Sequence, residues 1–190
     1  MIDISEKYGY TQSQDTRYEW LLPGVLPCEF YDSRHRAVTT QMFTGAHFEP
    51  LKEMYDSYYP KGKANGLPPP DDKLRHKWID FAVDIGTSII AEVDHRIIGH
   101  TILFPMPGKK RRAEFGIFVH QDFQGCAIGS SLTYITLAYA ARAGYECLWL
   151  IVEPRNRQAI KMYQRAGFDF EGEIDIEATM TMDLEHFFEK

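Results

Sequence analysis

One stretch of the sequence combines an apolar strand with a loop of small residues, a pattern suited to binding phosphate. The run Ile117-Phe118-Val119 leads into the loop Gln124-Gly125-Cys126-Ala127-Ile128-Gly129-Ser130, where an amphipathic helix begins. Small side chains let the backbone approach a bulky anion, and the amides at a helix N-terminus favour negative charge. The loop has neither the Gly-Lys-Ser/Thr of a triphosphate loop nor the GxGxxG of a dinucleotide loop. Helix–strand packing alone is the other explanation for these small residues.

A second stretch places a polar residue and a tyrosine on one face of a predicted helix. The segment NRQAIKMYQRAGF, residues 156–168, follows the apolar strand Leu148–Val152. Asn156 and Tyr163 are seven residues apart, so they lie on the same helix face about two turns from each other. Asn156 is also a good N-cap residue, and Gly167 is suited to end the helix.

Together the two stretches resemble the GCN5-related N-acetyltransferase superfamily. The residues Gln124 to Gly129 are similar to its Q/R-x-x-G/A-x-G/A loop, and residues 156–168 to its N-x-x-A-x-x-x-Y-x-x-x-G-F segment. The resemblance covers about residues 37–184 and implies that the loop holds the pyrophosphate of acetyl-CoA. Two positions depart from the family pattern, because Ala127 stands where glycine is usual and Cys126 where an arginine or lysine is common. Backbone donors would therefore carry most of the phosphate binding.

The resemblance also assigns roles in acetyl transfer from a thioester to an amine, in which the amine loses a proton, an oxyanion develops and a thiolate leaves. Tyr163 is the expected acid, since a phenol with a pKa of about 10 can protonate a thiolate whose conjugate acid has a pKa of about 8.5. The alternative role of Tyr163 is packing on the sheet. Asn156 is expected to cap its helix, to contact the pantetheine arm, or both. The backbone of Ile117-Phe118-Val119 would pair with pantetheine and stabilise the oxyanion.

The general base is less well defined by the sequence. Glu114 stands where several family members carry a carboxylate, although a strand glutamate that faces solvent is an equal alternative. Glu153 is the second candidate. His100 and His120 could also accept a proton, although a satisfied surface group is the expected role of a lone histidine at a strand end. In ribosomal-protein N-terminal acetyltransferases a glutamate lies in the fifth strand. Ile151 occupies the matching position here, which argues against that mechanism.

The elements that must position these residues alternate between strands and helices. Strands are expected at 37–43, 88–93, 97–104, 113–119, 148–152, 168–176 and 179–184, and helices at 48–59, from 71 to about 81, from 128 to near 144, and at 156–166. The strand at 148–152 is wholly apolar, which predicts burial on both faces. The fold class is α/β, a GNAT-like acyl-CoA N-acyltransferase fold with a central mixed, mostly antiparallel sheet flanked by helices. Residues 1–36 are expected to be an N-terminal extension packed on a domain formed by residues 37–190.

Composition narrows the class of protein further. The chain has 190 residues with 21 Lys+Arg against 27 Asp+Glu, a net charge of −6 that disfavours nucleic-acid binding. No apolar run reaches the roughly 20 residues of a membrane span. The three cysteines (Cys28, Cys126, Cys147) are widely spaced, which predicts free thiols, no metal site and a cytoplasmic location.

The expected activity is acetyl-CoA-dependent N-acetylation of a primary amine, on a small metabolite or a protein lysine, by direct attack in a ternary complex. The acceptor remains unidentified, and a homodimer is an open alternative to a monomer. Tyr55, Tyr58, Tyr59 and Trp78 are candidates to wall the acceptor site, besides packing in the core. A non-catalytic acyl-CoA-sensing module of the same fold is the alternative function.

Overall fold

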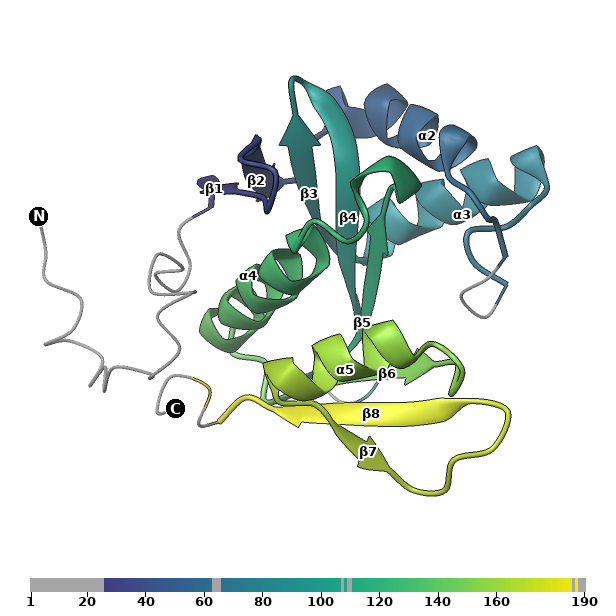
Figure 1. The fold of residues 1–190 in the computed structure, drawn as a ribbon. Coiled ribbons are helices and arrows are strands. Elements are labelled where there is room, and N and C mark those ends of the chain that lie inside the picture. Colours follow the sequence, from purple (N-terminus) through teal and green to yellow (C-terminus); the bar gives the residue numbers. More distant parts are fainter. Residues whose placement is uncertain (1–25, 63–65, 107, 109–110, 186, 188–190) are drawn as a thin grey trace, which may run out of the picture.

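The computed structural model describes residues 26–62, 66–106, 108, 111–185 and 187. Its centre is an eight-stranded sheet in the order β1-β2-β3-β4-β5-β6-β8-β7 (Figure 1). Every neighbouring pair is antiparallel except β5 with β6. The strands are β1 (Cys28–Tyr31), β2 (Ala37–Met42), β3 (Thr87–Val93), β4 (Arg96–Pro105), β5 (Arg112–Val119), β6 (Cys147–Val152), β7 (Asp169–Glu171) and β8 (Ala178–Asp183). The mixed, mostly antiparallel sheet that the sequence predicts is confirmed.

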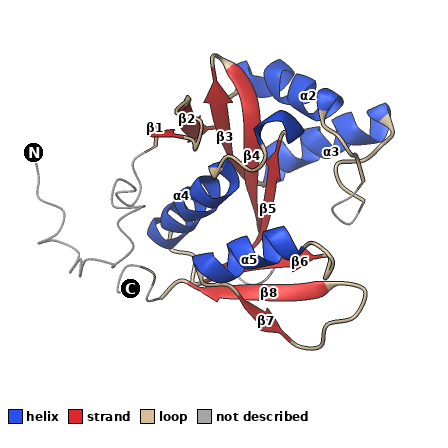
Figure 2. Ribbon diagram, viewed as in Figure 1, coloured by secondary structure: helices blue, strands red, loops and turns tan. Residues whose placement is uncertain are grey.

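Helices cover both faces of this sheet (Figure 2). The helical elements are η2 (Gly45–His47), α2 (Phe48–Ser57), α3 (Asp72–Ile85), η3 (Gln121–Phe123), α4 (Ile128–Arg142) and α5 (Arg157–Ala166). On one face, α4 and α5 bury apolar side chains of β5, β6 and β8. On the other, α2 and α3 pack against residues of β3, β4 and β5, among them Ile90, Ile102 and Phe118. Among the described residues, no helix has the length and apolar character needed to cross a membrane.

Local sequence explains where several elements begin and end. The tight β3–β4 turn uses Asp94 and His95 at φ values of 50° and 64°, a conformation that aspartate and histidine adopt more often than most other residues besides glycine. The carboxylate of Asp71 accepts the amide hydrogen of Leu74 at 2.9 Å and so caps α3. Gly167, at φ 102°, ends α5 in the left-handed conformation that glycine adopts without strain.

Three sequence expectations about strands need correction. Strand β1 precedes the predicted first strand and adds residues of the expected extension to the sheet edge. Strand β7 ends at Glu171, ahead of Gly172 at φ 76°, rather than continuing to residue 176. Strand β6 is buried on one face only, since Ile151 is 37% exposed. The physical reason is that α2 and α3 pack on β3 and β4 and leave that face of β6 uncovered.

Candidate active site

The central feature of the site is the divergence of β5 from β6. The two strands pair only at Arg112–Cys147, Ala113–Leu148 and Glu114–Trp149, although β5 continues to Val119. The His120 amide donates to the Ile98 carbonyl at 2.8 Å, which marks a hydrogen-bonded antiparallel pair. Because such pairs alternate along a strand, the amides of Ile117 and Val119 point away from β4, toward the gap that β6 leaves. The gap therefore offers backbone donors to a ligand that extends along β5.

The loop that follows β5 has the backbone shape of an anion cradle. Gly125 and Ala127 have φ values of 73° and 65°, and Ala127 is the N-cap of α4. The Ala127 carbonyl accepts the Ser131 amide hydrogen at 3.1 Å. Within the described part of the chain, the amides of residues 128–130 have no such partner, as expected for the first turn of a helix. These amides and the helix dipole together favour an anion here.

The side chains of this loop divide between the cavity and the core. Gln124, Gly125, Ala127, Gly129 and Ser130 line the cavity. Cys126 and Ile128 are each 1% exposed and pack in the core beside Phe30 and Leu132. Only the backbone of Cys126 and Ile128 can therefore reach a ligand. Gly129 has a packing role as well, since a Cβ there would lie 3.2 Å from the Met162 sulfur on α5.

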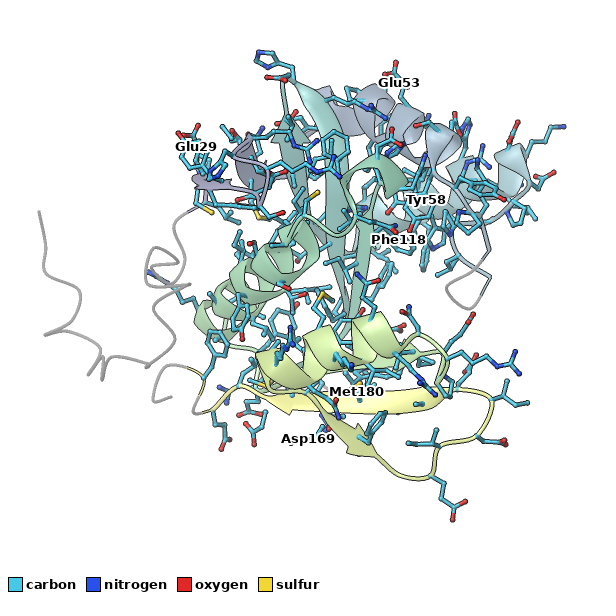
Figure 3. The ribbon with its side chains drawn as sticks, viewed as in Figure 1. Glu29, Glu53, Tyr58, Phe118, Asp169 and Met180 are labelled. Carbon is cyan, nitrogen blue, oxygen red and sulfur yellow. The ribbon has the colours of Figure 1, made fainter. Side chains whose placement is uncertain are left out.

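A cavity of about 960 Å³ joins the loop, the strand gap and the α2–α3 side of the sheet. The aromatic residues of its wall include Tyr58, Trp78, Phe118 and Phe104. The ring centroids of Tyr58 and Trp78 lie 6.1 and 5.5 Å from that of Phe118, and Figure 3 shows Tyr58 and Phe118 beside each other. The predicted wall residue Tyr55 is instead fully buried, and Tyr59 is 72% exposed and does not line the cavity.

Tyr163 lines this cavity from α5, with 8% of its surface exposed. Its ring packs edge-on against Phe115 and Phe168, at centroid distances of 6.3 and 5.7 Å. Burial raises the pKa of the Tyr163 phenol well above its ordinary value, and the nearby phenol of Tyr58 raises it further. No hydrogen bond to the Tyr163 hydroxyl is found among the described residues. The hydroxyl is thus protonated and available to a ligand in the cavity.

Asn156 both caps its helix and lies at the cavity. Its side-chain oxygen accepts the Ala159 amide hydrogen at 3.2 Å, which caps α5, and the residue also lines the cavity. The cap lies at the start of the helix that carries Tyr163, and both residues line the cavity.

Glu114 lies on the floor of the cavity, where β5 and β6 separate. It is half-buried and pairs across the sheet with Phe104. Because side chains alternate along a strand, Glu114 shares its face of β5 with Gly116 and Phe118, and Phe118 packs against α2 and α3. Burial raises the pKa of the Glu114 carboxyl. Among the residues described, no cation pairs with its carboxylate. Glu114 therefore faces the cavity, and its role as the general base stays a prediction.

The other candidate bases differ in accessibility. The expectation of surface histidines is wrong, because His100 is fully buried and His120 is 1% exposed. The Nδ1 of His100 lies 2.8 Å from the Tyr55 hydroxyl, and burial lowers the pKa of His100 to about 3. Burial, followed by the charge of Arg96, lowers the pKa of His120. Neither histidine lines the cavity, whereas Glu153 and Ile151 do.

Two lining residues, Tyr31 and Phe104, were not predicted from the sequence, and Leu67 of the loop between α2 and α3 also lines the cavity. Leu67 belongs to a loop that Arg75 holds in place. The Arg75 guanidinium donates to the Pro69 and Pro70 carbonyls at 3.2 and 3.1 Å. The same guanidinium pairs with Asp56 and Asp72, each at 2.6 Å. The only sequence signal for this arrangement is the run of three prolines ahead of a helix that carries an arginine on its inner face.

Comparisons with known proteins point to one family. Residues 48–168 match the model of the acetyltransferase (GNAT) family. The chain is 30% identical over 86 residues to the spermidine N(1)-acetyltransferase of Escherichia coli, covering 45% of this chain and 46% of that protein. It is 31% identical over 67 residues to the spermine/spermidine N(1)-acetyltransferase of Bacillus subtilis, covering 34% of this chain and 43% of that protein. The matches thus span less than half the length of these relatives.

Solved structures share the fold at low sequence identity. The GNAT domain of S. lividans PAT superposes with a TM-score of 0.71 at 17% identity, covering 82% of this chain and 96% of that one. A structure of yncA from Salmonella typhimurium with its cofactor acetyl-CoA has a TM-score of 0.63 at 16% identity, covering 78% of this chain and 94% of that one.

Proposed function

The chain belongs to the acetyltransferase (GNAT) family, and from this membership we propose that it transfers the acetyl group of acetyl-CoA to a primary amine. The observation that carries the proposal is the meeting of three features in one cavity. These are the unpaired edge of β5, the anion cradle at residues 124–130, and the hydroxyl of Tyr163. The pyrophosphate fits the cradle, and the pantetheine arm fits the strand edge as an added strand would.

In this proposal each residue meets one chemical need of direct attack in a ternary complex. Glu114 accepts a proton from the ammonium group, directly or through water, so that the amine nitrogen can form a bond to the thioester carbon. The amides of Ile117 and Val119 donate to the carbonyl oxygen as negative charge develops on it. When the carbon–sulfur bond breaks, Tyr163 gives its proton to the departing sulfur, and the second proton that the attacking nitrogen loses restores the Tyr163 phenol, directly or through water. Glu114 releases its proton to solvent, so the products are an amide, a free thiol and one proton.

The chemistry of the cavity narrows the acceptor to a cationic amine with an apolar chain. Trp78, Phe104 and Tyr58 offer aromatic surface to methylene groups, and Glu114 offers a carboxylate to the ammonium group. The basic residues of the lining, Lys161 and Arg165, both belong to α5 on the coenzyme side. The free carboxylate of an amino acid would therefore find no partner beside Glu114. Spermidine and spermine, named as substrates of the relatives, satisfy these conditions.

The test is a thiol-release assay with acetyl-CoA and a panel of acceptors. The panel contains spermidine, putrescine, butylamine, phenethylamine, free amino acids and lysine peptides. We expect turnover with amines that lack a neighbouring carboxylate, and at least tenfold lower kcat/KM for free amino acids, which is the cost of one unpaired buried charge. Binding of acetyl-CoA without turnover on any amine would instead support the acyl-CoA-sensing module.

A further inference from the structure

The turn between β1 and β2 lies against the phosphate cradle, outside the residues that match the family model. The Ser33 amide donates to the Cys126 carbonyl at 3.2 Å, which ties this turn directly to the loop. The guanidinium carbon of Arg36 also lies 4.4 Å from the ring centroid of Phe123, at the start of the same loop. One backbone hydrogen bond and one cation–π contact therefore connect the turn to the cradle.

The turn is also held rigid from within. The carboxylate of Asp32, 4% exposed, accepts the backbone amides of Arg34 and Arg36 at 2.8 and 2.9 Å. It accepts the Nε hydrogen of Arg36 at 2.8 Å as well. These bonds hold the pKa of Asp32 below its ordinary value, although burial alone would raise it. The side chains on either side of Asp32 are thus presented from a fixed backbone.

One of these side chains is an aromatic ring that the described residues leave uncovered. Tyr31 is 74% exposed, yet it lines the same cavity as Gln124 and Gly125. Its neighbour Phe30, one residue earlier on β1, is buried beside α4. An exposed ring next to a diphosphate site is a suitable platform for a purine, because every base has a π-face that can stack.

The turn also carries an arginine, a residue type that the loop lacks. No lysine or arginine occurs among residues 124–130, whereas Arg34 follows Tyr31 by three residues. The side chain of Arg34 is exposed, and among the described residues no carboxylate pairs with it. A guanidinium in this situation is suited to a phosphate dianion.

We propose that Tyr31 stacks on the adenine of coenzyme A and that Arg34 binds its ribose 3′-phosphate. The β1–β2 turn is then a recognition element for the adenosine end of the coenzyme, separate from the cradle for the diphosphate. This inference rests on the proposed use of acetyl-CoA, but it concerns binding and does not depend on any acceptor.

Calorimetric titration of the full chain with coenzyme A and with 3′-dephospho-coenzyme A tests the inference. Tyr31→Ala is expected to raise Kd for both ligands about tenfold, as the loss of one stacked base does. Arg34→Ala is expected to raise Kd about fivefold for coenzyme A, as the loss of one exposed charge-assisted contact does, and to leave dephospho-coenzyme A unchanged. Tyr31→Phe keeps the ring and should bind as the parent does.

Matched controls come from exposed residues elsewhere. Tyr59→Ala removes a ring that is 72% exposed and does not line the cavity, and Lys73→Ala removes an exposed charge on α3. Both should bind the two ligands as the parent does. Parental affinities in Tyr31→Ala and Arg34→Ala would overturn the inference while the proposed function stands. A parent chain that binds neither ligand would overturn the proposed function itself.

Discussion

Replacement of Tyr163 by phenylalanine separates the chemistry of the site from its architecture. The substitution removes one oxygen and keeps the ring that packs on Phe115 and Phe168. Because no hydrogen bond to this hydroxyl is found among the described residues, the free energy of unfolding should change by less than about 0.5 kcal/mol. The sulfur, however, loses its proton donor. General acid catalysis by one group contributes about 10²–10⁴-fold, so we expect kcat to fall about 100-fold, equivalent to about 2.7 kcal/mol.

The assay is steady-state thiol release at saturating acetyl-CoA and amine, with calorimetric measurement of acetyl-CoA binding to the same preparations. Kd should stay within about twofold of the parent value, since the ring still lines the cavity. Tyr139→Phe is the matched control, because Tyr139 lies partly buried on α4 and does not line the cavity. A Tyr163→Phe variant that keeps more than a third of the parental kcat would refute the assignment of Tyr163 as the acid.

Three other substitutions test the base, the loop and the α2–α3 side of the cavity. Glu114→Gln should abolish the acidic limb of the pH–rate profile that the titration of this carboxyl causes, a limb shifted upward because burial raises the pKa of Glu114. The rate deficit of the variant should shrink at alkaline pH, where the amine deprotonates unaided. An unchanged profile would contradict the base assignment. Ala127→Gly should raise the free energy of unfolding by about 1 kcal/mol in urea denaturation, because alanine is strained at φ 65°. A less stable variant would show that the loop tolerates alanine without strain. Arg75→Ala should cost about 2–3 kcal/mol in the same experiment, less than a fully buried ion pair because the side chain of Asp56 is 43% exposed. A loss below about 0.5 kcal/mol would show that this guanidinium does not hold the loop.

Local sequence was sufficient to predict the parts of the fold that depend on short-range rules. The β3–β4 hairpin, the cap of α3 at Asp71 and the end of α5 at Gly167 follow from turn and capping chemistry. The loop before α4 and the Asn156–Tyr163 spacing are likewise local patterns. These features were accessible because each depends on residues only a few positions apart in the chain.

Features that depend on the relation between distant strands could not be predicted in the same way. The divergence of β5 from β6 beyond Glu114 leaves no periodic signal, because β5 keeps its pairing with β4 throughout. The exposure of Ile151 follows from where α2 and α3 end on the sheet, and an apolar strand alone does not reveal it. The turn that holds Tyr31 lay outside both motifs, so its approach to Cys126 becomes visible only in three dimensions.

The central claim is that the backbone of residues 124–130 binds the diphosphate of coenzyme A while the Tyr163 hydroxyl faces the thioester. Diffraction from crystals grown with acetyl-CoA measures both halves of this claim at once. We predict phosphate density within hydrogen-bond distance of these amides and the sulfur beside the Tyr163 hydroxyl. A coenzyme bound elsewhere, or a phenol turned away from the sulfur, would contradict the account.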